Sequence, residues 1–115
     1  MRLSLTSIAI HTVQLNAIKA FYERFGLYFT QQQHGDSPVH YCAILLNNAM
    51  FEIFPGNERQ EQITIGFTAD AKDQVTPFIV RHFGTTSYER IERDGMIVYI
   101  FHDPDGRRVE LSQTI

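Results

Sequence analysis

Residues 101–111, Phe-His-Asp-Pro-Asp-Gly-Arg-Arg-Val-Glu-Leu, contain a turn followed by a strand with a glutamate at its centre. The Asp, Pro and Gly residues at positions 103–106 favour a tight turn, so they predict a hairpin between two strands. Val109 and Leu111 then flank Glu110, and this alternation of apolar and polar residues is typical of a strand with one buried face. A similar strand, Met-Phe-Glu-Ile-Phe, lies at residues 50–54, and its glutamate precedes Glu110 by 58 positions.

The same shift of 58 residues relates other landmarks and indicates an internal duplication. Gly26 and Gly84 each end a helix-like segment, and each segment follows a run of alternating apolar and polar residues. Each half therefore predicts the order strand, helix and then three strands. We expect one α+β domain over residues 1–115, built from two βαβββ units at about 1–58 and 59–115.

Hydrophobic periodicity predicts two helices, over residues 15–25 and 71–83. Gly26 suits the left-handed position that ends the first helix, and Asp70 is a candidate N-cap of the second. Pro77 would then bend the early turns of the second helix, because proline has no amide N–H. The predicted strands cover residues 6–12, 27–32, 39–46, 49–54, 62–68, 86–92, 96–102 and 107–113.

The period-two geometry of a strand decides which side chains the helices leave uncovered. The apolar positions of each strand must pack against a helix, so their neighbours point to the opposite face. The central glutamates, Glu52 and Glu110, thus lie on the helix-free face together with His11 and Arg108. If the two sheets curve together, this face becomes a cup.

Composition and charge narrow the class of protein. Of the 115 residues, 43% are hydrophobic and 20% are charged, an ordinary globular mixture that argues against disorder. The net charge of −3 provides no basic field for nucleic acid or an anionic membrane. The single cysteine, Cys42, lies in an apolar strand and reads as an inert buried thiol in a reducing compartment. We find no signal peptide and no run of about 18 apolar residues, so we expect a cytoplasmic protein.

Two motifs resemble those of a known superfamily. Residues 20–22, Ala-Phe-Tyr, before residues 25–27, Phe-Gly-Leu, resemble the "aFY…lG" signature of the glyoxalase, bleomycin-resistance and extradiol-dioxygenase (vicinal oxygen chelate) superfamily. Residues 101–111 resemble its "DPDGnxiEL" ending. The resemblance spans the whole chain and implies a curved mixed sheet around a cup, with helices on the outer face. Members of this superfamily commonly form dimers, so the resemblance also implies a homodimer.

The resemblance implies four metal-ligand positions, one in the first and one in the last strand of each half. They fall on Ser7, Glu52, Thr64 and Glu110. Ser7 and Thr64 stand where the superfamily commonly has histidine or glutamate, and neutral hydroxyls are poor ligands. A catalytic divalent ion needs about three protein ligands of suitable softness. We therefore expect no metal cofactor; a Zn, Ni, Mn or Fe ion, if bound, would be held by Glu52 and Glu110.

Six residues form the expected ligand-binding set, and no catalytic residue is assigned: Ser7, His11, Glu52, Thr64, Arg108 and Glu110. An unpaired carboxylate in a partly dry cavity is costly, so Glu52 and Glu110 need a cation, a hydrogen-bond donor or a proton. Arg108 flanks Glu110 on the same face, and His11 is a second candidate partner. His40 has no partner at metal-ligand spacing.

Two functions remain open from the sequence. The first is metal-free binding of a small molecule, polar and cationic or aromatic, in the cup between the two units. The second is a divalent-metal-dependent enzyme, a glyoxalase-like lyase or isomerase, a dioxygenase or a related transferase, with Glu52 and Glu110 as ligands. The incomplete ligand set favours the binding function, and a fold of this kind establishes no activity by itself. The sequence does not distinguish the binding function from a partner-binding protein with a vestigial site.

Overall fold

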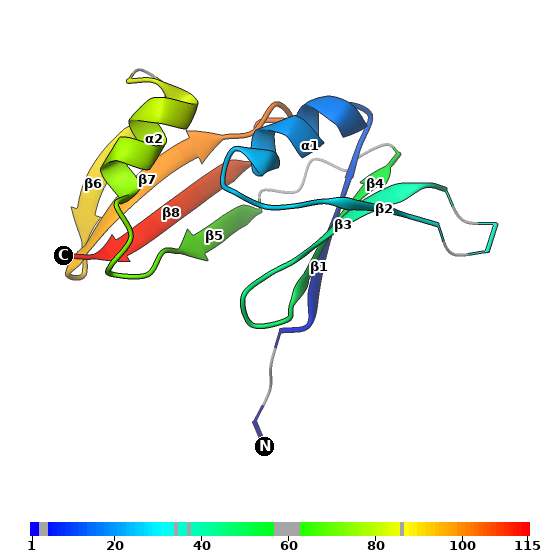
Figure 1. Ribbon diagram of the computed structural model, residues 1–115, viewed down its shortest axis with the longest axis horizontal. Coiled ribbons are helices and arrows are strands. Elements are labelled where there is room, and N and C mark those ends of the chain that lie inside the picture. The colour runs from blue at the N-terminus through cyan, green and yellow to red at the C-terminus, as the bar shows by residue number, and fades with distance from the viewer. Residues whose placement is uncertain (3–4, 34, 37, 57–62, 86) are drawn as a thin grey trace. The chain divides into compact units, whose positions relative to one another are not determined.

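The chain divides into two units, Met1–Gln60 and Glu61–Ile115, which Figure 1 colours from blue to green and from green to red. In its described part, each unit contains a strand, a helix and three further strands in chain order, as predicted. The boundary expected between residues 58 and 59 falls outside the described residues. The computed structural model describes residues 1–2, 5–33, 35–36, 38–56, 63–85 and 87–115.

The first unit places its described strands in one mixed sheet of order β1-β4-β3-β2. Strand β1 is parallel to β4, and the other pairs are antiparallel. The chain crosses from β1 to β2 through α1, and a crossover of this kind allows the first strand to run parallel to the last. The elements are β1 (Ser7–Thr12), α1 (Leu15–Glu23), β2 (Thr30–Gln32), β3 (His40–Ile44) and β4 (Met50–Pro55).

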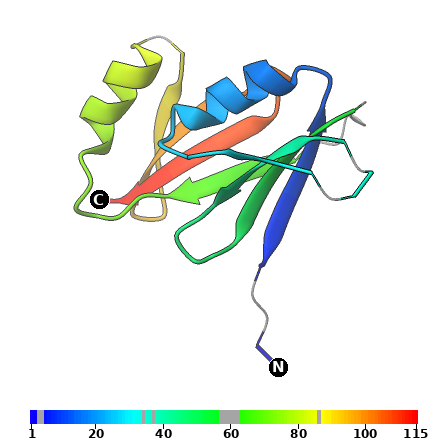
Figure 2. The same ribbon diagram turned by 45° about the vertical axis from the view of Figure 1, so that its right-hand side comes forward.

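The second unit repeats this arrangement in the order β5-β8-β7-β6. Figure 2 shows β8 in red between β5 in green and β7 in orange, and β5 is again parallel to β8. The shared order confirms the two βαβββ units that the duplication predicts. The elements are β5 (Thr64–Thr68), α2 (Val75–Phe83), β6 (Glu89–Arg93), β7 (Met96–His102) and β8 (Arg108–Thr114).

The core of the first unit lies between α1 and its sheet. Tyr22 of α1 and Phe51 of β4 are both fully buried, and their ring centroids are 4.8 Å apart. Phe29 contacts Phe51 edge-on at 6.0 Å. Ile18, four residues before Tyr22, is also fully buried. The apolar stripe predicted for this helix is therefore its packing face.

The second helix begins later than predicted. It spans Val75–Phe83 rather than residues 71–83, and Asp70 is not its N-cap. The Asp70 carboxylate instead accepts a hydrogen bond of 2.9 Å from the Lys72 backbone N–H in the preceding turn. Starting at Val75 places Pro77 in the first helical turn, where backbone N–H groups have no intrahelical acceptor. The proline consequently costs no hydrogen bond in α2.

Both helices are short. Each has nine residues and is therefore about 14 Å long, less than half the thickness of a membrane's hydrocarbon core. Among the described residues, no helix is long and apolar enough to cross a membrane.

Burial alternates along the strands as the period-two geometry predicts. In β4, Phe51 and Ile53 are fully buried while Glu52 between them is only partly buried. In β8, Val109 is fully buried and the next residue, Glu110, is partly exposed. Both glutamates thus lie on the helix-free face of their own sheet, as predicted.

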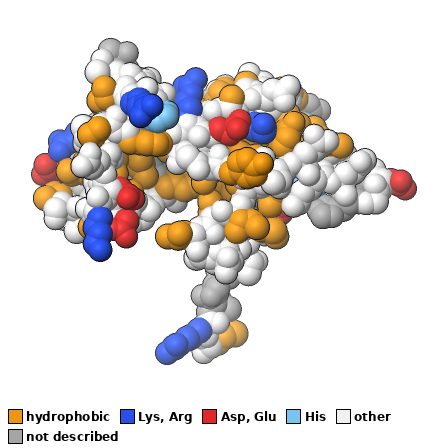
Figure 3. All heavy atoms as spheres, viewed as in Figure 1, with side chains coloured by type: hydrophobic (Ala, Val, Ile, Leu, Met, Phe, Trp, Pro, Cys, Tyr) orange, Lys and Arg blue, Asp and Glu red, His pale blue; other side chains and the backbone are white. Residues whose placement is uncertain are grey.

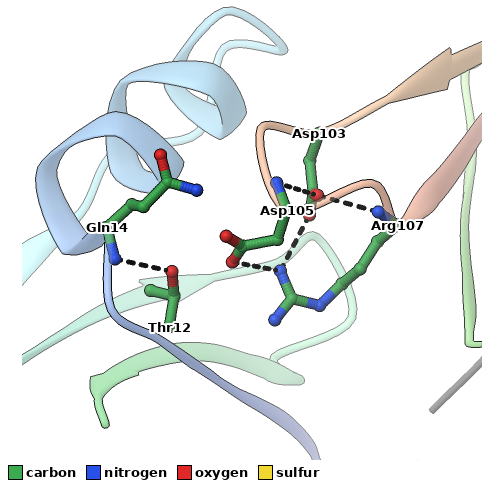
Figure 4. A network of polar contacts seen from close by, with 5 residues as sticks. All are labelled: Thr12, Gln14, Asp103, Asp105 and Arg107. Carbon is green, nitrogen blue, oxygen red and sulfur yellow. Dashed lines mark hydrogen bonds and ion pairs between the residues drawn. The ribbon is translucent and has the colours of Figure 1, made fainter. Parts of the chain in front are cut away.

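A buried ion pair closes the turn between β7 and β8 (Figure 4). Arg107 Nη1 lies 3.0 Å from Asp103 Oδ2 and 3.1 Å from Asp105 Oδ2. The Oδ1 atom of Asp103 accepts hydrogen bonds from the backbone N–H groups of Asp105 and Arg107, at 3.0 and 2.9 Å. Gly106 has a φ of +86°, which glycine adopts without strain. The structure confirms the predicted hairpin and adds a buried charge pair that the sequence pattern did not predict.

Candidate functional site

The helix-free face of the first sheet carries three rows of side chains across β1, β4 and β3. The rows are Ser7, Met50 and Ile44; Ala9, Glu52 and Cys42; and His11, Phe54 and His40. The first row is mainly apolar, the second is centred on a carboxylate, and the third is aromatic. Three predicted site residues, Ser7, His11 and Glu52, therefore share this face but stand in successive rows.

The third row is a stack of three nearly parallel rings. The Phe54 ring lies 4.2 Å from the His40 ring, with 16° between the planes. The His11 ring lies 5.3 Å from Phe54, at 21°. His40 is fully buried and His11 is exposed, so the stack runs from the interior of the unit to its surface. His11, expected as a candidate partner of Glu52, thus stacks on Phe54, and the register partner of Glu52 on β1 is Ala9.

Glu52 has a basic partner that sequence reasoning missed. The Nε2 atom of His40 lies 3.1 Å from Glu52 Oε2, and the Glu52 side chain is only 17% exposed. A buried imidazole and a poorly solvated carboxylate each lose hydration, which a close contact between them offsets. Counting outward from the predicted two-residue Asn47-Asn48 turn would pair residue 43 with Glu52. The hairpin instead pairs Leu45 with Ala49 and Cys42 with Glu52, and this register brings His40 to the face of Glu52. The sequence was expected to give His40 no partner at metal-ligand spacing, and its contact with Glu52 across the hairpin was not foreseen.

Cys42 lies on the same face, directly opposite Glu52 in the β3–β4 register. Its side chain is buried, and burial raises the pKa of the thiol above its ordinary value of 9.0, with a further contribution from the negative charge of Glu52. A thiol with a raised pKa is a poor nucleophile and a poor metal ligand at neutral pH. These features agree with the inert role expected for Cys42.

On the helix-free face of the second sheet, Glu110 bonds two arginines. Arg108 Nε donates to Glu110 Oε2 at 2.9 Å, and Arg93 Nη2 donates to Oε1 at 2.7 Å. The Arg108 contact was expected, because Arg108 and Glu110 are two residues apart on one strand and so share a face. Arg93 was not, because it comes from β6, with β7 lying between it and β8. We call Arg93, Glu110 and Arg108 the arginine–glutamate cluster.

The two arginines shift the ionisation of Glu110. The hydrogen bond from Arg93 is the largest cause and the one from Arg108 adds to it. Together they lower the pKa of Glu110 below its ordinary value of 4.5, although burial acts in the opposite direction. A carboxylate whose pKa is lower in the folded than in the unfolded state stabilises the fold above the unfolded pKa. That stabilisation is lost as the pH falls through the folded pKa.

We therefore predict an acid-sensitive contribution to stability at Glu110. Between about pH 5 and about pH 3, the free energy of unfolding should fall more steeply for the wild type than for Glu110→Gln. Urea denaturation followed by circular dichroism at each pH measures both slopes. Glu89→Gln is the matched control, since Glu89 forms no ion pair among the described residues and should keep the wild-type slope. Equal slopes for Glu110→Gln and the wild type would contradict the prediction.

Thr64 and Ser7 occupy corresponding edge-strand positions in the two units. Thr64 lies opposite Arg108 in the β5–β8 register, and Ser7 lies opposite Met50 in the β1–β4 register. Among the described residues, neither hydroxyl bonds a glutamate. The residue opposite Glu110 is Gly66, which has no side chain to offer.

The residues at the four implied metal positions do not fit a catalytic metal. The two hydroxyls of Ser7 and Thr64 are neutral, and each glutamate already contacts a basic side chain of its own sheet. In the described ranges, no three His, Cys, Asp or Glu side chains form a group suited to a metal ion. A metal bound by Glu52 or Glu110 would have to displace His40 or the two arginines.

Apolar side chains are exposed beside these polar groups. Ile44 is 70% exposed and Met50 is 39% exposed, and the two are register partners on the helix-free face of the first sheet. Figure 3 shows hydrophobic side chains interspersed with polar ones on the face of the molecule that it presents. The first unit thus combines exposed apolar surface, an aromatic stack and one carboxylate on one sheet face.

The fold is shared with proteins of known structure, although no family model and no curated protein matches the sequence. The oxidase ChaP-H2 is 18% identical with a TM-score of 0.73, over 100% of this chain and 96% of that chain. A lactoylglutathione lyase from Agrobacterium tumefaciens is 21% identical with a TM-score of 0.68, over 98% and 95%. A possible glyoxalase from Bacillus cereus is 16% identical with a TM-score of 0.71, over 96% and 98%. These likenesses confirm the glyoxalase, bleomycin-resistance and dioxygenase fold that the motifs imply, and at such identities they show the fold alone.

Proposed function

We propose that this protein binds a small organic molecule on the helix-free faces of its sheets, without a catalytic metal. One observation carries the proposal: both glutamates at the metal-ligand positions contact basic side chains of their own sheets. Glu52 lies against His40, and Glu110 lies between Arg93 and Arg108. Two guanidinium charges compensate the Glu110 carboxylate, and the Glu52 carboxylate is held against an imidazole, so a metal ion would have to compete with these contacts.

The first sheet supports binding of a molecule with an apolar or aromatic body. Ile44 and Met50 expose hydrophobic surface, and the exposed His11 ring continues the stack on Phe54. Aromatic rings favour stacked or edge-on contacts with other rings, and such pairs contribute about 0.5–1.5 kcal/mol beyond their area. Sites for small molecules typically combine apolar walls with a few polar groups, as this face does.

The second candidate is a metal-dependent lyase, isomerase or dioxygenase with Glu52 and Glu110 as ligands. The names of structural neighbours favour it, because they include a lactoylglutathione lyase and an oxidase. The side chains at the four implied metal positions argue against this candidate, since Ser7 and Thr64 stand in place of two expected ligands. Cytoplasmic location and a homodimer remain predictions from the sequence.

Metal titration separates the two candidates. Chelator-stripped protein is titrated by calorimetry with Ni, Zn, Mn, Co and anaerobic Fe(II). We expect no tight binding, because two carboxylates that already contact basic side chains and two hydroxyls form a weak donor set. Binding of about one ion per chain that disappears in both Glu52→Gln and Glu110→Gln would overturn the proposal.

Ligand binding itself is tested by thermal shift with small aromatic probes such as indole and phenol. We expect binders to raise the melting temperature, since a ligand that binds only the folded state stabilises it. Phe54→Ala should abolish the shift, because it removes the ring on which His11 stacks. Tyr28→Ala is the control, since Tyr28 is 80% exposed outside the strands, and it should keep the shift. A shift that survives in Phe54→Ala would place binding elsewhere and contradict the proposal.

A further inference from the structure

The arginine–glutamate cluster has more positive than negative charge. Two guanidinium groups share one carboxylate, which leaves a formal charge of one positive unit within the cluster. Glu89 lies on the same face at the edge strand, but it forms no ion pair with Arg93 or Arg108 in the part of the chain that the structure describes. A positively charged cluster favours an anionic ligand group, whereas the two carboxylates facing the expected cup had suggested a cationic ligand.

Each arginine retains unused hydrogen-bond donors. Arg93 contacts Glu110 through Nη2 alone, and Arg108 does so through Nε alone. A guanidinium group has several further N–H donors in a rigid plane. Neither arginine makes another bond within the described residues, and their side chains are 48% and 42% exposed. The remaining N–H groups are therefore available to a ligand.

The strand that the cluster spans, β7, presents apolar side chains on the same face of the sheet. The Arg93 side chain starts on β6 and reaches Glu110 on β8, so it crosses β7. The residues of β7 that share this face include Val98 and Ile100, which are buried. Hydrogen bonds between charged groups are stronger where water is excluded from one side. Glu110 also bonds both guanidinium groups, which lowers the entropy that they lose when a ligand binds.

We propose that Arg93 and Arg108 form an oxyanion-binding site, with Glu110 as the positioning residue that holds both guanidinium groups. The site takes a carboxylate or phosphate group of a small molecule, because a planar guanidinium donates two parallel hydrogen bonds to such groups. The inference deepens the proposed function and rests on it, since it names the polar group of a ligand on the second sheet.

The test follows the arginine side-chain Nε–H signals by nitrogen-15 NMR during titration with inorganic phosphate and, separately, with acetate. Chloride at matched ionic strength is the blank, and chelator is present throughout. We expect saturable shifts of the Arg93 and Arg108 signals. Arg90 lies on the same strand but faces the other side of the sheet, and its signal should stay unchanged. The anion that gives the larger shift identifies the phosphate or carboxylate class.

Variants separate a binding site from a structural cluster. Arg93→Gln and Arg108→Gln should each weaken anion binding at least about fivefold, since each removes charge-assisted hydrogen bonds. Arg90→Gln should bind as the wild type does. Glu110→Gln removes the competing negative charge but keeps an acceptor oxygen, so it should strengthen anion binding, whereas Glu110→Ala releases both guanidinium groups and should bind more weakly than Glu110→Gln. A merely structural cluster would show no anion binding in any variant.

The two proposals fail in different experiments. No shift of Arg93 or Arg108 with either anion, or an equal shift of Arg90, would overturn the oxyanion site. Tight metal binding lost in the two glutamate variants would instead overturn the metal-free function. Because the anion titration contains chelator, its outcome does not depend on the metal result.

Discussion

Replacing Arg107 with methionine is expected to lower the free energy of unfolding by about 3–5 kcal/mol. Arg107 and Asp103 are only 5% and 4% exposed, and their side chains meet at 3.0 Å in the β7–β8 turn. Removing the arginine leaves a buried carboxylate without its main counter-charge. The free energy of unfolding of a domain of this size is about 5–15 kcal/mol, so this loss would remove a large part of the total stability.

The measurement is urea denaturation followed by circular dichroism, since the chain has no tryptophan. Arg108→Met is the matched control: the neighbouring arginine is 42% exposed, and its ion pair should contribute about 1 kcal/mol or less. The double variant Asp103→Leu with Arg107→Met should recover part of the loss, because it buries no unpaired charge. A single Arg107→Met variant as stable as Arg108→Met would refute a structural role for the pair.

Phe51→Ala is expected to cost about 3–5 kcal/mol, the usual range for truncating a buried phenylalanine. Phe51 is fully buried on the helix-facing side of β4 and contacts the rings of Tyr22 and Phe29. The truncation leaves a cavity between α1 and the sheet, because close-packed neighbours relax only partly into the space. Denaturation in urea measures this loss as well.

Phe54→Ala provides the matched comparison on the same strand. Phe54 faces the helix-free side and is only partly buried, so its truncation should cost less than half of the Phe51→Ala loss. The two variants remove the same atoms, and only the sheet face differs. Equal losses would mean that the two faces of β4 are packed alike, which would argue against a helix-free face reserved for binding.

Local patterns in the sequence predicted most of the elements. The stripe containing Ile18 and Tyr22 predicted α1, and the alternation around Glu52 and Glu110 predicted β4 and β8 with the correct buried sides. These features depend on residues within one or two turns or a few strand positions of each other. The start of α2 was predicted wrongly, because the Asp70 turn was taken for an N-cap and the constraint from Pro77 was underestimated.

The partners of the two glutamates were harder to predict. His40 reaches Glu52 from an adjacent strand, and Arg93 reaches Glu110 from a strand two positions away. The first contact follows from the register of the β3–β4 hairpin, which a count from the predicted two-residue turn misses by one residue. The second depends on the order of strands in the sheet and on the reach of a long side chain, and no local pattern encodes either.

The sequence by itself therefore determined the two βαβββ units and the sheet face on which Glu52 and Glu110 lie, because side-chain alternation is a local property of a strand. Only the tertiary structure decided which basic side chains contact them, because strand order and register bring together residues that are distant in the chain. That difference changes the chemistry of the candidate site. Two apparent metal ligands become one glutamate against a buried histidine and one between two arginines.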